Sequence, residues 1–88
     1  MISVESIDSN SFSVSVTKDS VTEHIVLLND HFHQDVTNNK LTKTEFITHS
    51  FEFLLKRESN QSILKKFNLE IISQYFPEYI DEIKKIIL

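Results

Sequence analysis

The chain of 88 residues contains no cysteine, glycine, alanine or tryptophan, and it contains a single proline. The absence of cysteine excludes disulfide bonds, cysteine-based zinc sites and thiol catalysis, and it favours a reducing cytoplasm as the compartment. The absence of glycine leaves asparagine to supply backbone positions with positive φ, and the candidates are Asn10, Asn38, Asn39 and Asn68. We expect turns at these positions.

Long apolar runs are absent as well. No segment approaches the ~18 apolar residues that a membrane-spanning helix needs. The first ten residues, MISVESIDSN, lack the basic start and apolar stretch of a signal peptide. We therefore expect a chain that neither spans a membrane nor is exported by that route. The length and the 40% hydrophobic content predict one domain over residues 1–88.

Charge is distributed unevenly along the chain. The formal net charge of −4 divides into −5 over residues 1–39, +3 over residues 40–66 and −2 over residues 67–88. Mixed charge of this kind is typical of a small soluble domain. The asymmetry between an acidic and a mildly basic part would also orient a partner or a second copy.

Residues 2–28 show the period-two pattern of half-buried strands. Apolar side chains alternate with serine up to Val16, and a third apolar stretch covers residues 21–28. Polar turn sequences at residues 8–10 and 18–20 separate the three segments. The pattern predicts a three-stranded antiparallel β-meander, with apolar side chains on both faces of its third strand.

The apolar residues of the second half have helical spacing. Thr42 and Glu45 form a capping-box sequence, which predicts a central helix over about residues 43–58, after a short helix over about residues 30–37. The predicted apolar face of the central helix consists of Phe46, Ile47, Phe51, Phe53, Leu54 and Leu55. The sequence therefore predicts an α+β fold, in which the meander is followed by, and packed against, a helical C-terminal half.

Three shorter helices are expected after the central one. Apolar spacing predicts one on each side of Asn68, within residues 59–76, and a last helix with Pro77 in its first turn. The first two are similar in layout to a helix-turn-helix unit, with Lys65 and Lys66 beside them. Nucleic-acid binding through this helix pair is thus the alternative function, although the second helix offers no cation for phosphate.

His31, His33 and Asp35 are the one cluster whose side chains suit a transition metal. On a helix, positions two apart point in different directions, so the three would share a face only on an extended segment. A structural zinc site would also need His24 or His49. Solvated histidines on an acidic helix are the simpler interpretation, so we expect no metal and no cofactor. The sequence also lacks a P-loop, a nucleophile elbow and a phosphate-binding glycine loop, and we expect no enzymatic activity.

The second half carries a family resemblance. The residues concerned are Ser50-Phe51, Phe53-Leu54-Leu55, Arg57-Glu58, Ser62-Ile63-Leu64, Phe67, Leu69, Ile72 and Tyr75-Phe76-Pro77-Glu78-Tyr79. With a β-rich start before this block, the chain resembles a family of short, uncharacterised bacterial proteins. The resemblance implies an architecture and transfers no catalytic or binding residue.

More apolar side chains lie near the C-terminus than are needed to form the buried stripe of one helix. Tyr75, Phe76 and Tyr79 bring three aromatic rings together, which is typical of an interface hot spot, although a plug for a corner of the core is an equally simple use. Ile86 and Leu88 add further apolar surface. We expect a small protein-interaction module that forms homo-oligomers, with these five residues as the candidate interface.

Overall fold

The computed structural model describes all residues from Met1 to Leu88. The elements in chain order are β1 (Ile2–Ser6), β2 (Ser11–Thr17), β3 (Val21–Leu27), α1 (Asp30–Thr37), α2 (Lys43–Leu55), the 3-10 helix η1 (Asn60–Ser62), β4 (Lys66–Asn68), the 3-10 helix η2 (Leu69–Ile71), α3 (Ile72–Tyr75) and α4 (Tyr79–Ile86). The predicted α+β class, antiparallel meander and central helix are confirmed. None of the helices combines the length and the apolar character needed to span a bilayer.

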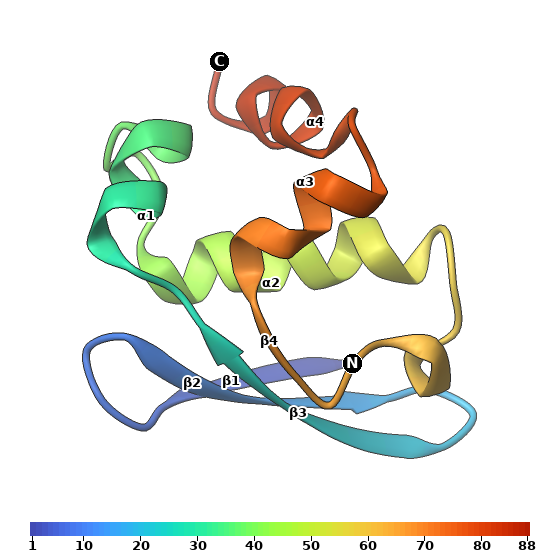
Figure 1. Cartoon of the computed structure of the whole chain (residues 1–88). Coiled ribbons are helices and arrows are strands. Elements are labelled where there is room, and N and C mark those ends of the chain that lie inside the picture. The colour runs from blue at the N-terminus through green and yellow to red at the C-terminus, as the bar shows by residue number, and fades with distance from the viewer.

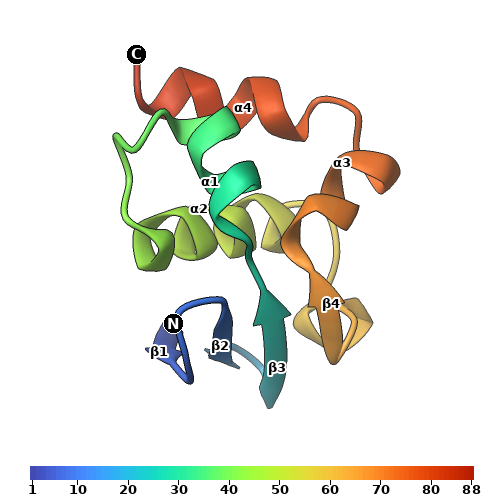
Figure 2. The same ribbon diagram turned by 60° about the vertical axis from the view of Figure 1, so that its left-hand side comes forward.

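The elements form three layers. Figure 1 shows the sheet at the bottom, α2 lying across it, and α1, α3 and α4 on the other side of α2. Figure 2 shows the same order after a 60° turn, with no helix on the far face of the sheet. Because α2 is enclosed between the sheet and the outer helices, Phe46, Ile47 and Phe51 are completely buried.

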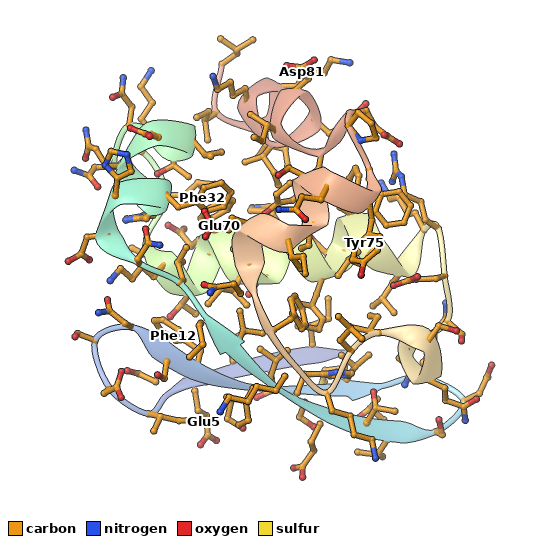
Figure 3. The ribbon with its side chains drawn as sticks, in the orientation of Figure 1. Glu5, Phe12, Phe32, Glu70, Tyr75 and Asp81 are labelled. Atoms are coloured by element: carbon orange, nitrogen blue, oxygen red, sulfur yellow. The ribbon has the colours of Figure 1, made fainter.

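The meander has one covered and one open face. β1 pairs with β2 and β2 with β3, both antiparallel, so that Val4, Val14 and His24 line up across the strands. In Figure 3 Phe12 lies on the helix side of the sheet and Glu5 on the opposite side. In β2 the apolar side chains thus face α2 and the serines face away, whereas β3 also carries the half-buried Ile25 and Leu27 on the open face, as predicted.

Residues 66–68 form a fourth strand that the sequence does not predict. β4 runs parallel to β3 and places Phe67 opposite Val26, and the Ile25 amide donates to the Lys65 carbonyl at 2.7 Å. The helix predicted from Ser59 is therefore wrong, because one turn of 3-10 helix is followed by extended chain. The strand is too short to show alternation, and it forms because the edge of β3 supplies hydrogen-bond partners.

The start of α2 is confirmed, and its end comes earlier than predicted. The Thr42 hydroxyl accepts from the Glu45 amide at 3.1 Å, and the Glu45 carboxylate accepts from the Thr42 amide at 2.9 Å, which completes the capping box. The helix ends at Leu55 rather than near residue 58. Of the predicted apolar face only Leu55 is not fully buried.

Two of the four asparagines adopt the left-handed conformation. Asn38 and Asn39 have φ of 55° and 59° and end α1, as expected for a chain without glycine. Asn68 is extended, with φ of −77°, because it lies at the end of β4. Asn10 lies in the turn between β1 and β2 without positive φ. Positive φ is thus confirmed at Asn38 and Asn39 and is wrong for Asn10 and Asn68, and the predicted turn is confirmed at Asn10 but not at Asn68.

Pro77 lies just before α4 rather than within its first turn. The residue before it, Phe76, is extended with φ of −131° and ψ of 95°, as the proline ring requires. The Tyr79 amide donates to the Phe76 carbonyl at 3.0 Å across this turn. The proline therefore sets the corner at which α3 gives way to α4.

Candidate functional site

An apolar groove of about 330 Å³ opens between the end of α2, the chain around β4 and α3. We call it the Tyr75 groove. It is lined by Leu54 and Glu58, by Ser62, Ile63, Leu64 and Phe67, and by Ile71, Ile72, Tyr75 and Phe76. Figure 3 shows Tyr75 between α3 and the η1 region. Tyr75 is 65% exposed and Leu64 48% exposed, so two large apolar side chains border the opening.

One wall of the groove is held against the sheet by buried polar contacts. The Asn60 side-chain amide donates to the Ser20 carbonyl and to the Thr22 hydroxyl, both at 3.1 Å. His24 Nδ1 lies 2.8 Å from the Leu64 carbonyl. Since both contacts join η1 and the chain after it to β3, the backbone of Leu64 is held in place while its side chain faces outward.

His24 is a structural histidine with a defined tautomer. The Leu64 carbonyl can only accept, so Nδ1 carries the hydrogen. Nε2 lies 3.0 Å from the Thr22 hydroxyl, which accepts from Asn60 and is free to donate to a neutral ring. The ring also packs against Phe51, with centroids 5.4 Å apart. Every polar atom of the side chain is therefore used within the fold.

The opposite wall is braced by Arg57. Its guanidinium lies 3.6 Å above the Phe53 ring and 6.0 Å from the Phe76 ring. Its Nε donates to the Glu78 carboxylate at 3.2 Å. The pKa of Glu78 lies below its ordinary value, first because the backbone amide of Glu78 donates a hydrogen bond to the carboxylate and then because the Arg57 guanidinium does so. Phe76 is thereby fixed as part of the groove.

Glu58 is the one charged residue of the lining. It is half-buried at the end of α2, and its carboxylate has no ion-pair partner within 4.0 Å. Ser62 is the only other polar residue that lines the groove. The site therefore offers a broad apolar surface with one unpaired negative charge at its side, which suits an apolar ligand that carries a cation.

The five residues of the predicted interface are separated by the fold. Tyr75 and Phe76 belong to the groove. Ile86 is 48% and Leu88 98% exposed, at the other end of α4. Tyr79 is completely buried, because its ring packs against Phe53 and its hydroxyl donates to the Ser50 hydroxyl. Tyr79 is therefore not available to a partner. The first residue of α4 faces α2, so the prediction that Tyr79 belongs to an interface is wrong.

The three candidate metal ligands do not converge. His31 Nε2 lies 3.1 Å from the Asp35 carboxylate on the exposed side of α1. His33 Nε2 instead donates to the Leu41 carbonyl at 2.6 Å. His49 bonds Glu52 on α2, and His24 is enclosed in the core. No group of three or more His, Cys, Asp or Glu side chains is placed to hold a metal ion.

The helix pair required by the nucleic-acid alternative does not form. Residues 59–76 contain η1, β4, η2 and the single turn of α3, so no helix of this segment is long enough to act as a recognition helix. Lys65 and Lys66 flank the start of β4 instead of a helix. Nucleic-acid binding through a helix pair in residues 59–76 therefore has no helix pair to use.

Sequence reasoning missed Leu64 and Glu58 as groove residues. The predicted helices include both residues: Leu64 lies within residues 59–76, and Glu58 is the last residue of the predicted central helix. The available signal was the pair of adjacent apolar residues, Ile63 and Leu64, because neighbours in an extended chain cannot both face the core. In the structure Ile63 is buried and Leu64 is exposed.

Comparisons with known proteins found no matching family model, no matching curated protein and no matching solved structure. The resemblance to a family of short bacterial proteins therefore stays a prediction.

Proposed function

We propose that this chain is a small non-enzymatic protein-interaction module that associates with copies of itself through the Tyr75 groove. The observation that carries the proposal is the pairing of an apolar cavity of about 330 Å³ with exposed Leu64 and Tyr75 at its opening. Exposed apolar patches of this kind on a small domain mark binding surfaces, because covering them releases ordered water.

The chemistry of the groove supports binding rather than catalysis. Eight of its ten lining residues are hydrophobic, and the two polar ones are Glu58 and Ser62. The Ser62 hydroxyl bonds the Ser59 hydroxyl rather than Glu58, so the groove holds no paired nucleophile and base. At about 330 Å³ the volume lies at the low end of the ~300–1,000 Å³ typical of ligand pockets. A few inserted aliphatic side chains would fill it.

The rigidity of the groove walls also supports the proposal. Leu64 is held through its carbonyl by His24, and Phe76 is held by Arg57. A partner would meet a wall whose backbone is already held in place, which reduces the entropy lost on association. Tyr75 adds a large side chain with few rotatable bonds, the type that dominates interface energies. Because the chain lacks cysteine, we place this association in a reducing cytoplasm.

The experiment is light scattering and sedimentation over a concentration series for the parent chain, for Leu64→Ser/Tyr75→Ser, and for Ile7→Ser. Ile7 is 56% exposed in the turn between β1 and β2, away from the groove, so it controls for the loss of exposed apolar surface. We expect the parent and the Ile7 variant to associate with rising concentration, and the groove variant to remain monomeric with an unchanged circular dichroism spectrum. A parent chain that stays monomeric at the highest concentration would reject self-association.

A further inference from the structure

We infer that the ligand of the Tyr75 groove is the basic, apolar C-terminal segment, residues 84–88, of a second copy of this chain. The inference rests on the proposed self-association and names the two surfaces that meet. The segment reads Lys-Lys-Ile-Ile-Leu, and it places two ammonium groups beside Ile86 and Leu88. We call it the KKIIL tail.

The apolar parts of the two surfaces are complementary. Ile86 is 48% exposed and Leu88 is 98% exposed, so about half of Ile86 and nearly all of Leu88 is left uncovered by the chain to which they belong. Leu64 and Tyr75 border an opening that leads onto buried aliphatic and aromatic side chains. Two aliphatic side chains of the tail would occupy a groove of about 330 Å³ and remove exposed apolar surface from both copies.

The charges are complementary as well. Glu58, the one charged residue of the groove, has no ion-pair partner. Lys84 in the last turn of α4 has none either, whereas Lys85 lies 3.5 Å from Glu82. An apolar groove with an unpaired carboxylate therefore faces an apolar segment with an unpaired ammonium, and their attraction would select and orient the contact.

The geometry makes the contact intermolecular. α4 begins beside α3, which carries Tyr75, and runs away from it, so the C-terminus lies at the opposite end of the helix (Figures 1 and 2). Its eight residues extend about 12 Å at the helical rise. The tail thus cannot enter the groove of its own chain, while two copies can exchange tails around a twofold axis and form the contact twice.

A charge exchange tests the pairing of Glu58 with Lys84. Glu58→Lys alone places two cations in each contact, and Lys84→Glu alone places two carboxylates there. We expect each variant to raise the dissociation constant of the oligomer roughly tenfold or more, measured by sedimentation. A mixture of the two variants brings opposite charges together in both contacts of a mixed dimer, so we expect it to recover the association of the parent. Asp81→Lys, on the exposed side of α4, controls for net charge.

Apolar truncation provides the second test. Leu64→Ser/Tyr75→Ser and Ile86→Ser/Leu88→Ser should each be monomeric alone, and together they should form a mixed dimer through the one contact in which groove and tail are both intact. Thermal unfolding of each variant by circular dichroism establishes that it is folded.

The outcomes separate this inference from the proposed function. A parent chain that remains monomeric rejects both. An associating parent whose charge variants are not rescued by mixing, or whose tail variant still associates, rejects the tail as the ligand and leaves the groove to a different surface of the second copy. Weakening by both single variants together with rescue by mixing supports the tail, because a groove-to-groove contact would not respond to Lys84→Glu and a tail-to-tail contact would not respond to Glu58→Lys.

Discussion

The Tyr79 hydroxyl donates to the Ser50 hydroxyl at 2.5 Å inside the core, and this hydrogen bond joins α4 to α2 across 29 positions of the chain. Ser50 in turn donates to the Phe46 carbonyl at 2.7 Å, one turn earlier in α2. Both hydroxyls are therefore satisfied although both residues are completely buried. The Tyr79 ring packs edge-on against Phe53, which places the start of α4 on the outer side of α2.

Tyr79→Phe should reduce the free energy of unfolding by roughly 0.5–1.5 kcal/mol. The substitution removes the hydrogen bond and keeps the ring contacts, and Ser50 retains the Phe46 carbonyl as acceptor. Urea unfolding followed by circular dichroism measures the difference. Tyr75→Phe, at an exposed position, is the matched control and should leave the unfolding free energy unchanged. A Tyr79→Phe chain as stable as the parent would show that the hydrogen bond adds nothing to stability.

Tyr79 should also make the fold sensitive to alkali. Burial raises the pKa of Tyr79 above its ordinary value of 10.0, and the hydrogen bond with Ser50 opposes this only in part. Because the folded state holds the proton more tightly than the unfolded state, this contribution to stability is complete below pH 10 and is lost as the pH rises further. In a Tyr75→Phe chain, where Tyr79 is the only tyrosine, phenolate absorbance should appear together with the loss of the circular dichroism signal. Ionisation of a folded chain would contradict this prediction.

His24→Gln should destabilise the chain by about 1–3 kcal/mol, because it disturbs the bonds to the Leu64 carbonyl and the Thr22 hydroxyl in a buried setting. His31→Gln is the control, since His31 is largely exposed on α1. Long-range ¹H–¹⁵N NMR spectra of the neutral imidazole should show the hydrogen on Nδ1. An Nε2–H tautomer would be incompatible with donation to Leu64.

The ion pair between Asp30 and Lys43 should weaken in acid. The Lys43 ammonium contacts the Asp30 carboxylate, the Ser9 carbonyl at 2.7 Å and the Asn10 side chain at 3.1 Å, so it links α1, α2 and the β1–β2 turn. The hydrogen bond and charge of Lys43 hold the pKa of Asp30 below its ordinary value of 3.8. The contribution is therefore present above pH 3.8 and is lost as the pH falls through the lowered pKa.

Asp30→Asn tests this linkage. The variant should unfold at a lower urea concentration than the parent at pH 7, and the two midpoints should converge as the pH falls through the lowered pKa of Asp30. Asp19→Asn, at a carboxylate without an ion pair, serves as the control. A gap that persists unchanged in acid would mean that Asp30 stabilises the fold by something other than its charge.

Several elements of the fold could be predicted because their signals are local. The capping box of Thr42 and Glu45 involves residues three apart, and the alternation in the first strands involves nearest neighbours. Asn38 and Asn39 end α1 in the left-handed conformation, which asparagine adopts here because the chain has no glycine. Each of these signals acts within a few residues, so no knowledge of the rest of the chain was needed.

The groove could be predicted only in part. Tyr75 and Phe76 were expected to form a binding surface, and the structure places them side by side in the lining. Tyr79 belongs to the same aromatic run, yet its burial depends on Ser50, 29 positions earlier. Leu64 faces outward because the preceding Ile63 is extended and buried, whereas the apolar spacing of this segment predicted a helix.

The sequence by itself determined the α+β class, the meander, the central helix and the start of that helix, because hydrophobic periodicity and capping act between near neighbours. Only the tertiary structure decided that residues 66–68 join β3 as a parallel strand, that Tyr79 is buried, and that the end of α2 meets α3 around a groove. The parallel strand and the burial of Tyr79 depend on partners 41 and 29 positions apart, Ile25 with Lys66 and Ser50 with Tyr79. A short segment such as Lys-Phe-Asn has no strong preference of its own, so the hydrogen bonds and burial offered by distant residues select its conformation.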